Sequence, residues 1–239
     1  MTPADHIAAL RRDGNRIATS VEGRLNRIVP SCPGWQVADL VWHVGIVHMF
    51  WRMVACGVLA GPEAWGEPDR PDTDGLLAWF AEGVDLTATT LAGLDPGTPA
   101  WTWGHRRDVG FIGRRVAQET AVHCWDAVTA SGFDEPVEQA LAVDGIDEFL
   151  DEVLPGLSHD LAGPAQTICL YAHDSGDAWS VRAGEGSVSL DRSPGQAQAT
   201  VTGTASDLLL LLWGRRSSSR VLVDGDITAL QRFLARAAF

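Results

Sequence analysis

The chain has 239 residues, of which 46% are hydrophobic, so it is long enough for one large domain or two modest ones. Its formal net charge is −13, and arginine is the only strong base because the sequence contains no lysine; this argues against nucleic acid as a general partner. No apolar run reaches the roughly 18 to 20 residues of a membrane helix, and the four cysteines form no CxxC pair, so we expect a soluble protein with reduced thiols and no membrane partner.

The first half of the sequence predicts four amphipathic helices. Charged residues interrupt the apolar positions near the N-terminus, unlike a secretory signal, and we therefore expect a cytoplasmic location. Thr2 is a suitable cap for a first helix that has proline in its first turn. Further helices are expected from near Gln36 to about Cys56, from about Asp74 to Leu94, and from Val109 to Ala130. We predict a four-helix bundle over residues 1–131, a fold in which metal sites are commonly built from facing helices.

After Ser131-Gly132 the pattern changes to a mixture of helix and strand, which predicts a small α+β domain over residues 132–239. A helix near Val137 to Val153 comes first. Turn-forming residues separate the first two strands, which we expect to form a hairpin. The strands are expected at Thr167–His173, Ala178–Arg182, Ser187–Leu190, Ala197–Thr202 and Arg220–Val223, and the remaining helices at Ala205–Trp213 and Ile227–Ala237.

Three residues suggest a metal site: His43, Glu119 and His123. Glu119 and His123 stand four residues apart, so on a helix their side chains leave the same face about one turn apart. All three fall in apolar stripes that should face the core, where an unpaired carboxylate is costly. Two imidazoles and one carboxylate suit zinc or a similar divalent metal and leave a coordination position open. The alternative is a surface ion pair between Glu119 and Arg115, with the histidines merely hydrogen-bonded in the core.

Some neighbouring residues are less specific. Asp126 either orients a metal ligand or is a surface carboxylate of the helix. His48 points about 140° away from His43 on an ideal helix and is therefore not expected to be a ligand. Cys124 is interpreted as a packed thiol. No phosphate-binding glycine loop, catalytic serine motif or dinucleotide fingerprint is visible.

Two segments resemble a known family. They are Cys32–His43, which reads CPGWQVADLVWH, and Arg114–Ala127, which reads RRVAQETAVHCWDA. Both resemble the mycothiol-dependent maleylpyruvate isomerase family, and the second half resembles the sterol-carrier-like C-terminal domain of that family. The resemblance implies an N-terminal DinB-like four-helix bundle followed by a small α+β domain. It also implies that His43, Glu119 and His123 are the ligands of a divalent metal, usually Zn2+.

The resemblance further implies a function. In this family the metal is taken to bind a low-molecular-weight thiol, mycothiol, which loses its proton and becomes a nucleophile. Addition to an activated double bond, rotation and elimination give cis-trans isomerisation, whereas addition without elimination is S-transfer. The expected partners are thus a small thiol and a small electrophile. An isomerase, a mycothiol S-transferase in detoxification or secondary metabolism, and a non-catalytic metal- or ligand-binding protein all remain open.

The segment Leu208–Arg216 resembles the part of the family's second domain that ends in a Gly-Arg pair. An arginine from that domain is implicated in the family's active site, and Arg215 is the best positional match. We expect Arg215 to be catalytic, because its guanidinium could hold a substrate carboxylate in a bidentate fork. The alternative is an arginine that interacts with the C-terminal helix dipole. Arg216 and Arg220 are competing candidates.

Overall fold

The computed structural model describes residues 1–157 and 163–237 and divides the chain into two compact units, Met1–Glu135 and Pro136–Phe239. The first unit is mostly helical and the second contains a small mixed sheet, so the predicted fold class is confirmed. Among the described helices, none is long and apolar enough to cross a membrane.

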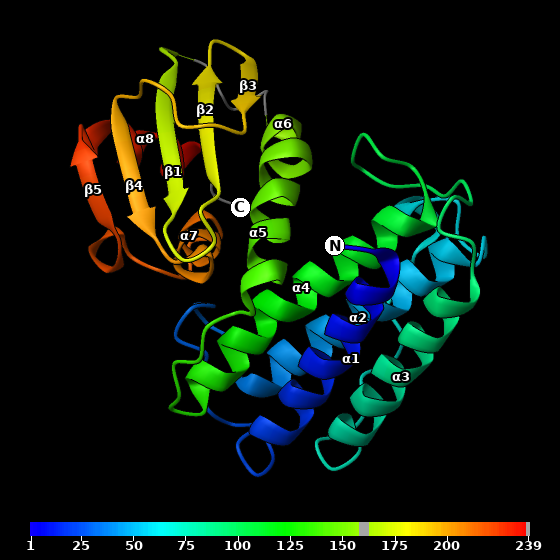
Figure 1. Ribbon diagram of the computed structural model, residues 1–239. Coiled ribbons are helices and arrows are strands. Elements are labelled where there is room, and N and C mark those ends of the chain that lie inside the picture. The colour runs from blue at the N-terminus through cyan, green and yellow to red at the C-terminus, as the bar shows by residue number, and fades with distance from the viewer. Residues whose placement is uncertain (158–162, 238–239) are drawn as a thin grey trace. The chain divides into compact units, whose positions relative to one another are not determined.

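Four long helices make up the first unit (Figure 1). They are α1 (Pro3–Ser20), α2 (Val37–Ala55), α3 (Leu76–Gly93) and α4 (Val109–Ala130), and a short 3-10 turn, Pro62–Ala64, interrupts the loop before α3. Both α1 and α2 pack against α3 and against α4, so the four helices close into a ring. The four predicted helices are confirmed, and the third begins at Leu76, two residues later than expected.

Side-chain caps define where the helices begin. Thr2 accepts a hydrogen bond from the backbone of Asp5, and the Asp5 carboxylate accepts one from the backbone of Thr2 at 2.8 Å. At the start of α4, the Asp108 carboxylate accepts a hydrogen bond from the backbone N–H of Phe111 at 2.7 Å. Capping therefore fixes the first turn of α4, and with it the position of every residue that follows on that helix.

Two glycines let the helices approach α3 closely. A Cβ atom on Gly45 of α2 would lie 2.2 Å from Cζ3 of Trp79, and one on Gly14 of α1 would lie 2.6 Å from Cγ1 of Val84. A larger residue at either position would require the facing side chain of α3 to move. His43 and His48 lie on either side of Gly45 along α2, so this contact sets the position of both histidines.

The second unit begins with a helical segment. α5 (Gln139–Glu148) continues through a π-helical turn, Phe149–Val153, into the single turn α6 (Leu154–Gly156). Sequence analysis predicted one helix here from Val137 to Val153. The observed α-helix begins two residues later, because Glu138 caps it by accepting hydrogen bonds from the backbones of Ala140 and Leu141.

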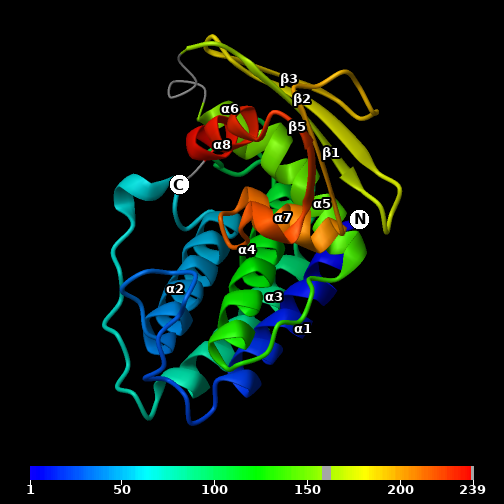
Figure 2. The same ribbon diagram turned by 90° about the vertical axis from the view of Figure 1, so that its left-hand side faces the viewer.

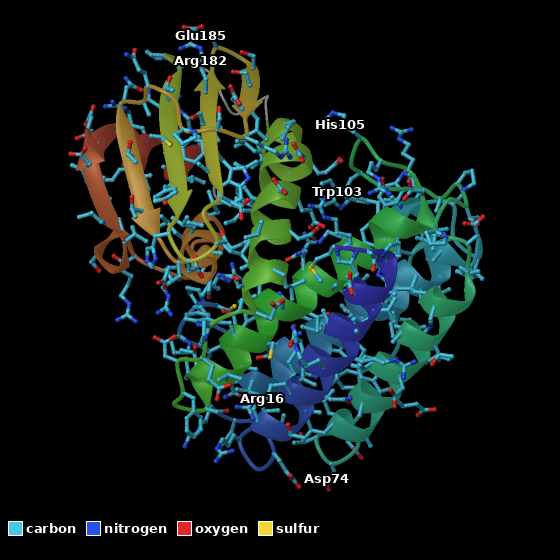
Figure 3. The ribbon with its side chains drawn as sticks, viewed as in Figure 1. Arg16, Asp74, Trp103, His105, Arg182 and Glu185 are labelled. Carbon is cyan, nitrogen blue, oxygen red and sulfur yellow. The ribbon has the colours of Figure 1, made fainter. Side chains whose placement is uncertain are left out.

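The five strands found among the described residues form one sheet in the order β3-β2-β1-β4-β5. β1 and β2 pair antiparallel, which confirms the predicted hairpin, whereas β1 and β4 pair parallel. At the turn between β2 and β3, Arg182 donates a hydrogen bond to Glu185 at 3.2 Å (Figure 3). The bounds are β1 (Gln166–Ala172), β2 (Ala178–Gly184), β3 (Ser187–Asp191), β4 (Ala199–Gly203) and β5 (Leu222–Gly225).

Helices cover one face of this sheet (Figure 2). α7 (Ala205–Leu212) and α8 (Ile227–Arg236) both contact β1 and β4, and the side chains between them include the fully buried Ile168 and Val201. The last strand was predicted at Arg220–Val223, and this was wrong by two residues. Arg220 instead ends a 3-10 turn, Ser218–Arg220, which begins where Ser217 accepts a hydrogen bond from the backbone of Ser219.

Candidate metal centre

The structure brings His43, Glu119 and His123 together on the neighbouring helices α2 and α4. Nε2 of His43 and Nε2 of His123 each lie 3.2 Å from the same oxygen, Oε1 of Glu119. One donor atom from each residue lies within 4.8 Å of the other two. Tetrahedral ligands held about 2.1 Å from a zinc ion are about 3.4 Å apart, so only small side-chain movements separate this arrangement from a coordination sphere.

Glu119 also has a cationic partner, Arg115, which lies one turn earlier on α4. The Arg115 guanidinium donates to the second carboxylate oxygen, Oε2, at 3.0 Å. The side chain of Arg115 is only 4% exposed, so this is a buried ion pair rather than the surface pair considered in the sequence. The arginine and the two histidines thus use different oxygens of one carboxylate, and the ion pair leaves Oε1 directed at the imidazoles.

These contacts determine the charge of Glu119. Burial on its own raises the pKa of the carboxyl, but hydrogen bonds from His123 and His43 and the charge of Arg115 outweigh it. The pKa of Glu119 is consequently held well below its usual range. The carboxylate is ionised at neutral pH, which is the state that binds a metal.

Asp126 orients His123. Nδ1 of His123 donates to Oδ2 of Asp126 at 2.9 Å, and the Asp126 side chain is completely buried. The sequence left two interpretations of Asp126 open, and the one in which it is a surface carboxylate is therefore wrong. Because Nδ1 is held by Asp126, Nε2 is the ring nitrogen that faces Glu119. Burial lowers the pKa of His123, but the hydrogen bonds to Asp126 and Glu119 prevail and raise it to about 9.

Asp126 receives further hydrogen bonds from the loop before α2, which sequence reasoning missed. Ser31 Oγ donates to Oδ1, and Cys32 Sγ lies 3.6 Å from Oδ2. The backbone N–H of Cys32 donates to the carbonyl of Val29 at 3.1 Å, and Gly34 has a φ of +86°, a conformation that favours glycine. The Cys-Pro-Gly-Trp turn therefore places its polar side chains beside α4. The sequence signal was the turn itself, which indicates a tight loop without showing what it contacts.

Trp35, at the end of the same turn, lies against both candidate imidazoles. The centroid of its ring is 5.0 Å from that of His43 and 6.5 Å from that of His123, with which it is nearly parallel. Side-chain exposure falls from 34% at His43 to 19% at Glu119 and 8% at His123. The site is thus buried on the His123 side and open to solvent on the His43 side, where Trp35 forms one wall.

His48 also contacts α4, but it lies outside this cluster. Its Nε2 is 2.8 Å from Oγ1 of Thr120, whose own hydroxyl donates to the carbonyl of Val116. Nε2 of His48 must therefore donate to Thr120. Nδ1 is buried and has no hydrogen-bond partner among the described residues. Burial lowers the pKa of His48 to about 3, so the ring is neutral.

Two further features of the bundle do not belong to the triad. Cys124 is part of the apolar core, where burial raises the pKa of its thiol. Trp103 and His105 lie on the loop that enters α4 (Figure 3). Glu119 is ten residues into α4, which corresponds to about 15 Å along the helix, so this loop lies well away from the candidate ligands.

The three candidate arginines follow α7 in the second unit. Nε of Arg216 pairs with Asp207 at 2.8 Å, and its side chain is only 11% exposed. Arg215 donates from its guanidinium to the carbonyl of Trp213 at 2.8 Å. Arg220 ends the 3-10 turn. The ion pair gives Arg216 a structural partner on α7. Arg215 donates to a backbone carbonyl at the helix end, as expected for an arginine near the C-terminal dipole.

A helical bundle with a two-histidine, one-carboxylate donor set, followed by a unit with a mixed sheet, defines a two-domain protein with a candidate metal centre. Residues 7–128 match the profile of the mycothiol maleylpyruvate isomerase N-terminal domain, and residues 140–232 match that of the C-terminal domain of the same family. The chain therefore belongs to the mycothiol-dependent maleylpyruvate isomerase family, as the resemblance in its sequence predicted.

Solved structures agree on the fold. The crystal structure of the mycothiol-dependent maleylpyruvate isomerase matches with a TM-score of 0.66 and 14% sequence identity, over 95% of each chain. A histidine-to-alanine mutant of that isomerase matches with the same TM-score and coverage at 12% identity. No curated protein sequence matches the chain significantly. At these identities the likeness to solved structures shows the fold.

Proposed function

We propose that this protein is a metal-dependent thiol enzyme that adds a low-molecular-weight thiol, mycothiol, to a small electrophile and so isomerises it. The observation that carries this proposal is the cluster of His43, Glu119 and His123, with its donor atoms within 4.8 Å of one another and one side open to solvent. Family membership supports the choice of thiol and of reaction. An accessible site with three protein ligands favours catalysis over a sealed structural metal.

The donor set fits a divalent cation, with zinc as the first choice. Such a cation, when bound, supplies a site at which a thiol loses its proton at neutral pH. Two neutral imidazoles contribute no charge, and Glu119 is already paired with Arg115. The occupied cluster would thus be formally cationic, which favours an anionic group in the open position.

The chain's own residues prepare this site in three ways. Arg115 fixes one oxygen of Glu119 and leaves the other directed at the histidines. Asp126 holds Nδ1 of His123, so that Nε2 is the nitrogen available as a ligand. Trp35 provides an apolar wall beside the exposed His43, which limits the access of water from that side.

Metal analysis tests the first part of the proposal. Protein purified without a histidine tag is expected to contain, or to take up, about one zinc ion per chain. Glu119→Gln should lose this ion, whereas Glu82→Gln, a matched change at an exposed position of α3, should keep it. A protein that contains no metal and fails to bind zinc would refute the proposal.

The reaction is tested with mycothiol and maleylpyruvate. Turnover to fumarylpyruvate that requires the thiol would support an isomerase. Stable adducts with other electrophiles, without turnover of maleylpyruvate, would support the second candidate, a mycothiol S-transferase. The same cationic site would serve both reactions, because they differ only in whether the thiol is eliminated after it has added.

We further propose that Arg215 binds an anionic group of the substrate. Arg216 is a weaker candidate because its guanidinium already pairs with Asp207. Arg215→Gln should raise KM for an anionic electrophile by about 10- to 100-fold, the usual value of a hydrogen bond to a charged group. Arg220→Gln is the matched control and should leave KM unchanged. An equal effect of both changes would argue against Arg215.

The cysteines bear on location. All four are described, and none forms a disulfide. This is typical of a reducing compartment and supports a cytoplasmic location for the proposed enzyme.

A further inference from the structure

A second group of metal-binding side chains lies beside the first and shares one residue with it. Sγ of Cys32, a ring nitrogen of His123 and a carboxylate oxygen of Asp126 all lie within 4.8 Å of one another. Oδ2 of Asp126 is the common neighbour, 2.9 Å from Nδ1 of His123 and 3.6 Å from Sγ of Cys32. These three side chains come from the Cys-Pro-Gly-Trp turn and from α4, and all belong to the first unit.

The chemistry of this group differs from that of the triad. A thiolate and a carboxylate together balance the charge of a divalent cation, so the occupied cluster would be electrically neutral. Neutrality suits its surroundings, because Asp126 is fully buried and His123 is 6% exposed. Sulfur is a soft ligand, and one thiolate with one imidazole and one carboxylate suits the d10 ions Zn2+ and Cd2+.

The shared histidine couples the two sites. A neutral imidazole has one lone pair, which can lie on Nε2, facing Glu119, or on Nδ1, facing Asp126. A cation beside Cys32 needs the lone pair on Nδ1, whereas a cation in the triad needs it on Nε2. The two sites therefore compete for His123, unless the ring loses both of its protons.

From this geometry we propose that Cys32, Asp126 and Nδ1 of His123 form a second site, for thiophilic divalent cations, that competes with the triad for His123. Binding releases two protons to solvent, the thiol proton of Cys32 and the Nδ1 proton of His123, and the imidazole keeps one proton on Nε2. An ion in this site takes a ligand from the triad, so cadmium would act as an antagonist of triad occupancy. Cation binding by Cys32 and Asp126 is independent of the proposed function, whereas the competition for His123 rests on the triad being the proposed metal site.

Cadmium titration of the metal-free protein tests the proposal. Cadmium has no absorption of its own, whereas a cadmium-thiolate bond gives a charge-transfer band in the ultraviolet. Cys56 is exposed and would add a signal, so the reference protein is Cys56→Ser. The band should appear in this reference and vanish when Cys32→Ser is added. It should persist when His43→Ala is added instead, because that change removes only a triad ligand.

A second measurement uses the unaltered chain. Cys32 is half-buried, and cadmium should slow its alkylation by iodoacetamide, read by peptide mass spectrometry, at least about tenfold more than it slows alkylation of Cys56. A charge-transfer band that survives Cys32→Ser, or one that disappears with His43→Ala, would overturn the proposal. So would cadmium binding that leaves the alkylation of Cys32 unchanged.

Discussion

Two histidines on α2, His43 and His48, face α4 only five residues apart, yet they contact different kinds of partner. His43 meets the carboxylate of Glu119 and is one-third exposed. His48 meets the hydroxyl of the next residue, Thr120, and is completely buried. Their partners are consecutive in sequence, but on a helix consecutive residues point about 100° apart.

The partner, and not the histidine itself, determines what each position can do. A carboxylate beside an imidazole attracts positive charge, whether a proton or a metal ion. A hydroxyl that is already committed to a backbone carbonyl only accepts the imidazole N–H, and burial then keeps His48 neutral. One helix interface thus contains a candidate ion site and, beside it, an uncharged polar contact.

The largest effect is expected from removing the carboxylate. Glu119→Gln should weaken zinc binding more than about 100-fold, beyond the 10- to 100-fold typical of residues that only support a ligand. The loss follows because the amide cannot offset the charge of the ion. Competition with a fluorescent chelator measures the affinity. Near-normal affinity in this variant would mean that Glu119 is not a ligand.

The second effect concerns acid stability and His48. Its pKa is about 3 in the folded protein and near 6.5 when the chain unfolds, so the unfolded state binds more protons between these values. The stability should therefore fall as the pH is lowered from 6.5, by about 3 kcal/mol at pH 4.5 from this group alone. Urea unfolding of the metal-free protein at several pH values measures the slope.

His48→Leu separates this contribution from those of other groups. The variant should show a clearly shallower loss of stability on acidification than the natural chain. His105→Gln, a change at an exposed loop position, should leave the slope as it was. Equal slopes in the natural chain and His48→Leu would contradict a buried neutral histidine.

A third, smaller effect is expected at the residue that orients His123. Asp126→Asn keeps the shape of the side chain but removes its charge, and should weaken zinc binding by about 10- to 100-fold. The same change should lower the pKa of His123, because one of its two anionic partners is gone. Chelator competition and NMR titration of the imidazole measure the two quantities. Unchanged values for both would show that Asp126 has no influence on the site.

The smallest effect tests the hydroxyl partner. Thr120→Val removes the acceptor of the His48 N–H and should cost about 1 to 3 kcal/mol of stability, as for a buried donor left unpaired. Zinc affinity should not change, although the substituted residue is next to Glu119. A large loss of zinc binding here would mean that the two positions are coupled, and the contrast between the histidines would fail.

Sequence periodicity predicted the helices and the grouping of Glu119 with His123, because the helical repeat alone places residues four apart on one face. It also set His48 apart from His43 by angle. Sequence periodicity could not predict the buried contacts of Asp126. They come from Ser31 and Cys32, more than 90 residues earlier in the chain, through a loop whose path depends on tertiary hydrogen bonds.

Local departures from regular structure were missed for a related reason. The π-helical turn at Phe149–Val153 and the 3-10 turn that delays β5 leave the apolar pattern nearly unchanged. Hydrophobic spacing reports which side of an element is buried, but not the hydrogen-bond pattern at its ends. The ion pair of Arg115 with Glu119 was foreseen from spacing, whereas its burial depends on how the four helices close into a ring.

The contact between Gly45 and Trp79 has a consequence for how this bundle can change over time. Because the indole of Trp79 occupies the space beside Gly45, a larger residue at Gly45 would require that ring to move. While this contact is kept, His43 and His48 keep their positions on α2, and the α4 residues that they contact can be substituted one at a time. New chemistry in this fold would therefore arise by substitution of residues along α4, whereas the histidines of α2 stay unchanged.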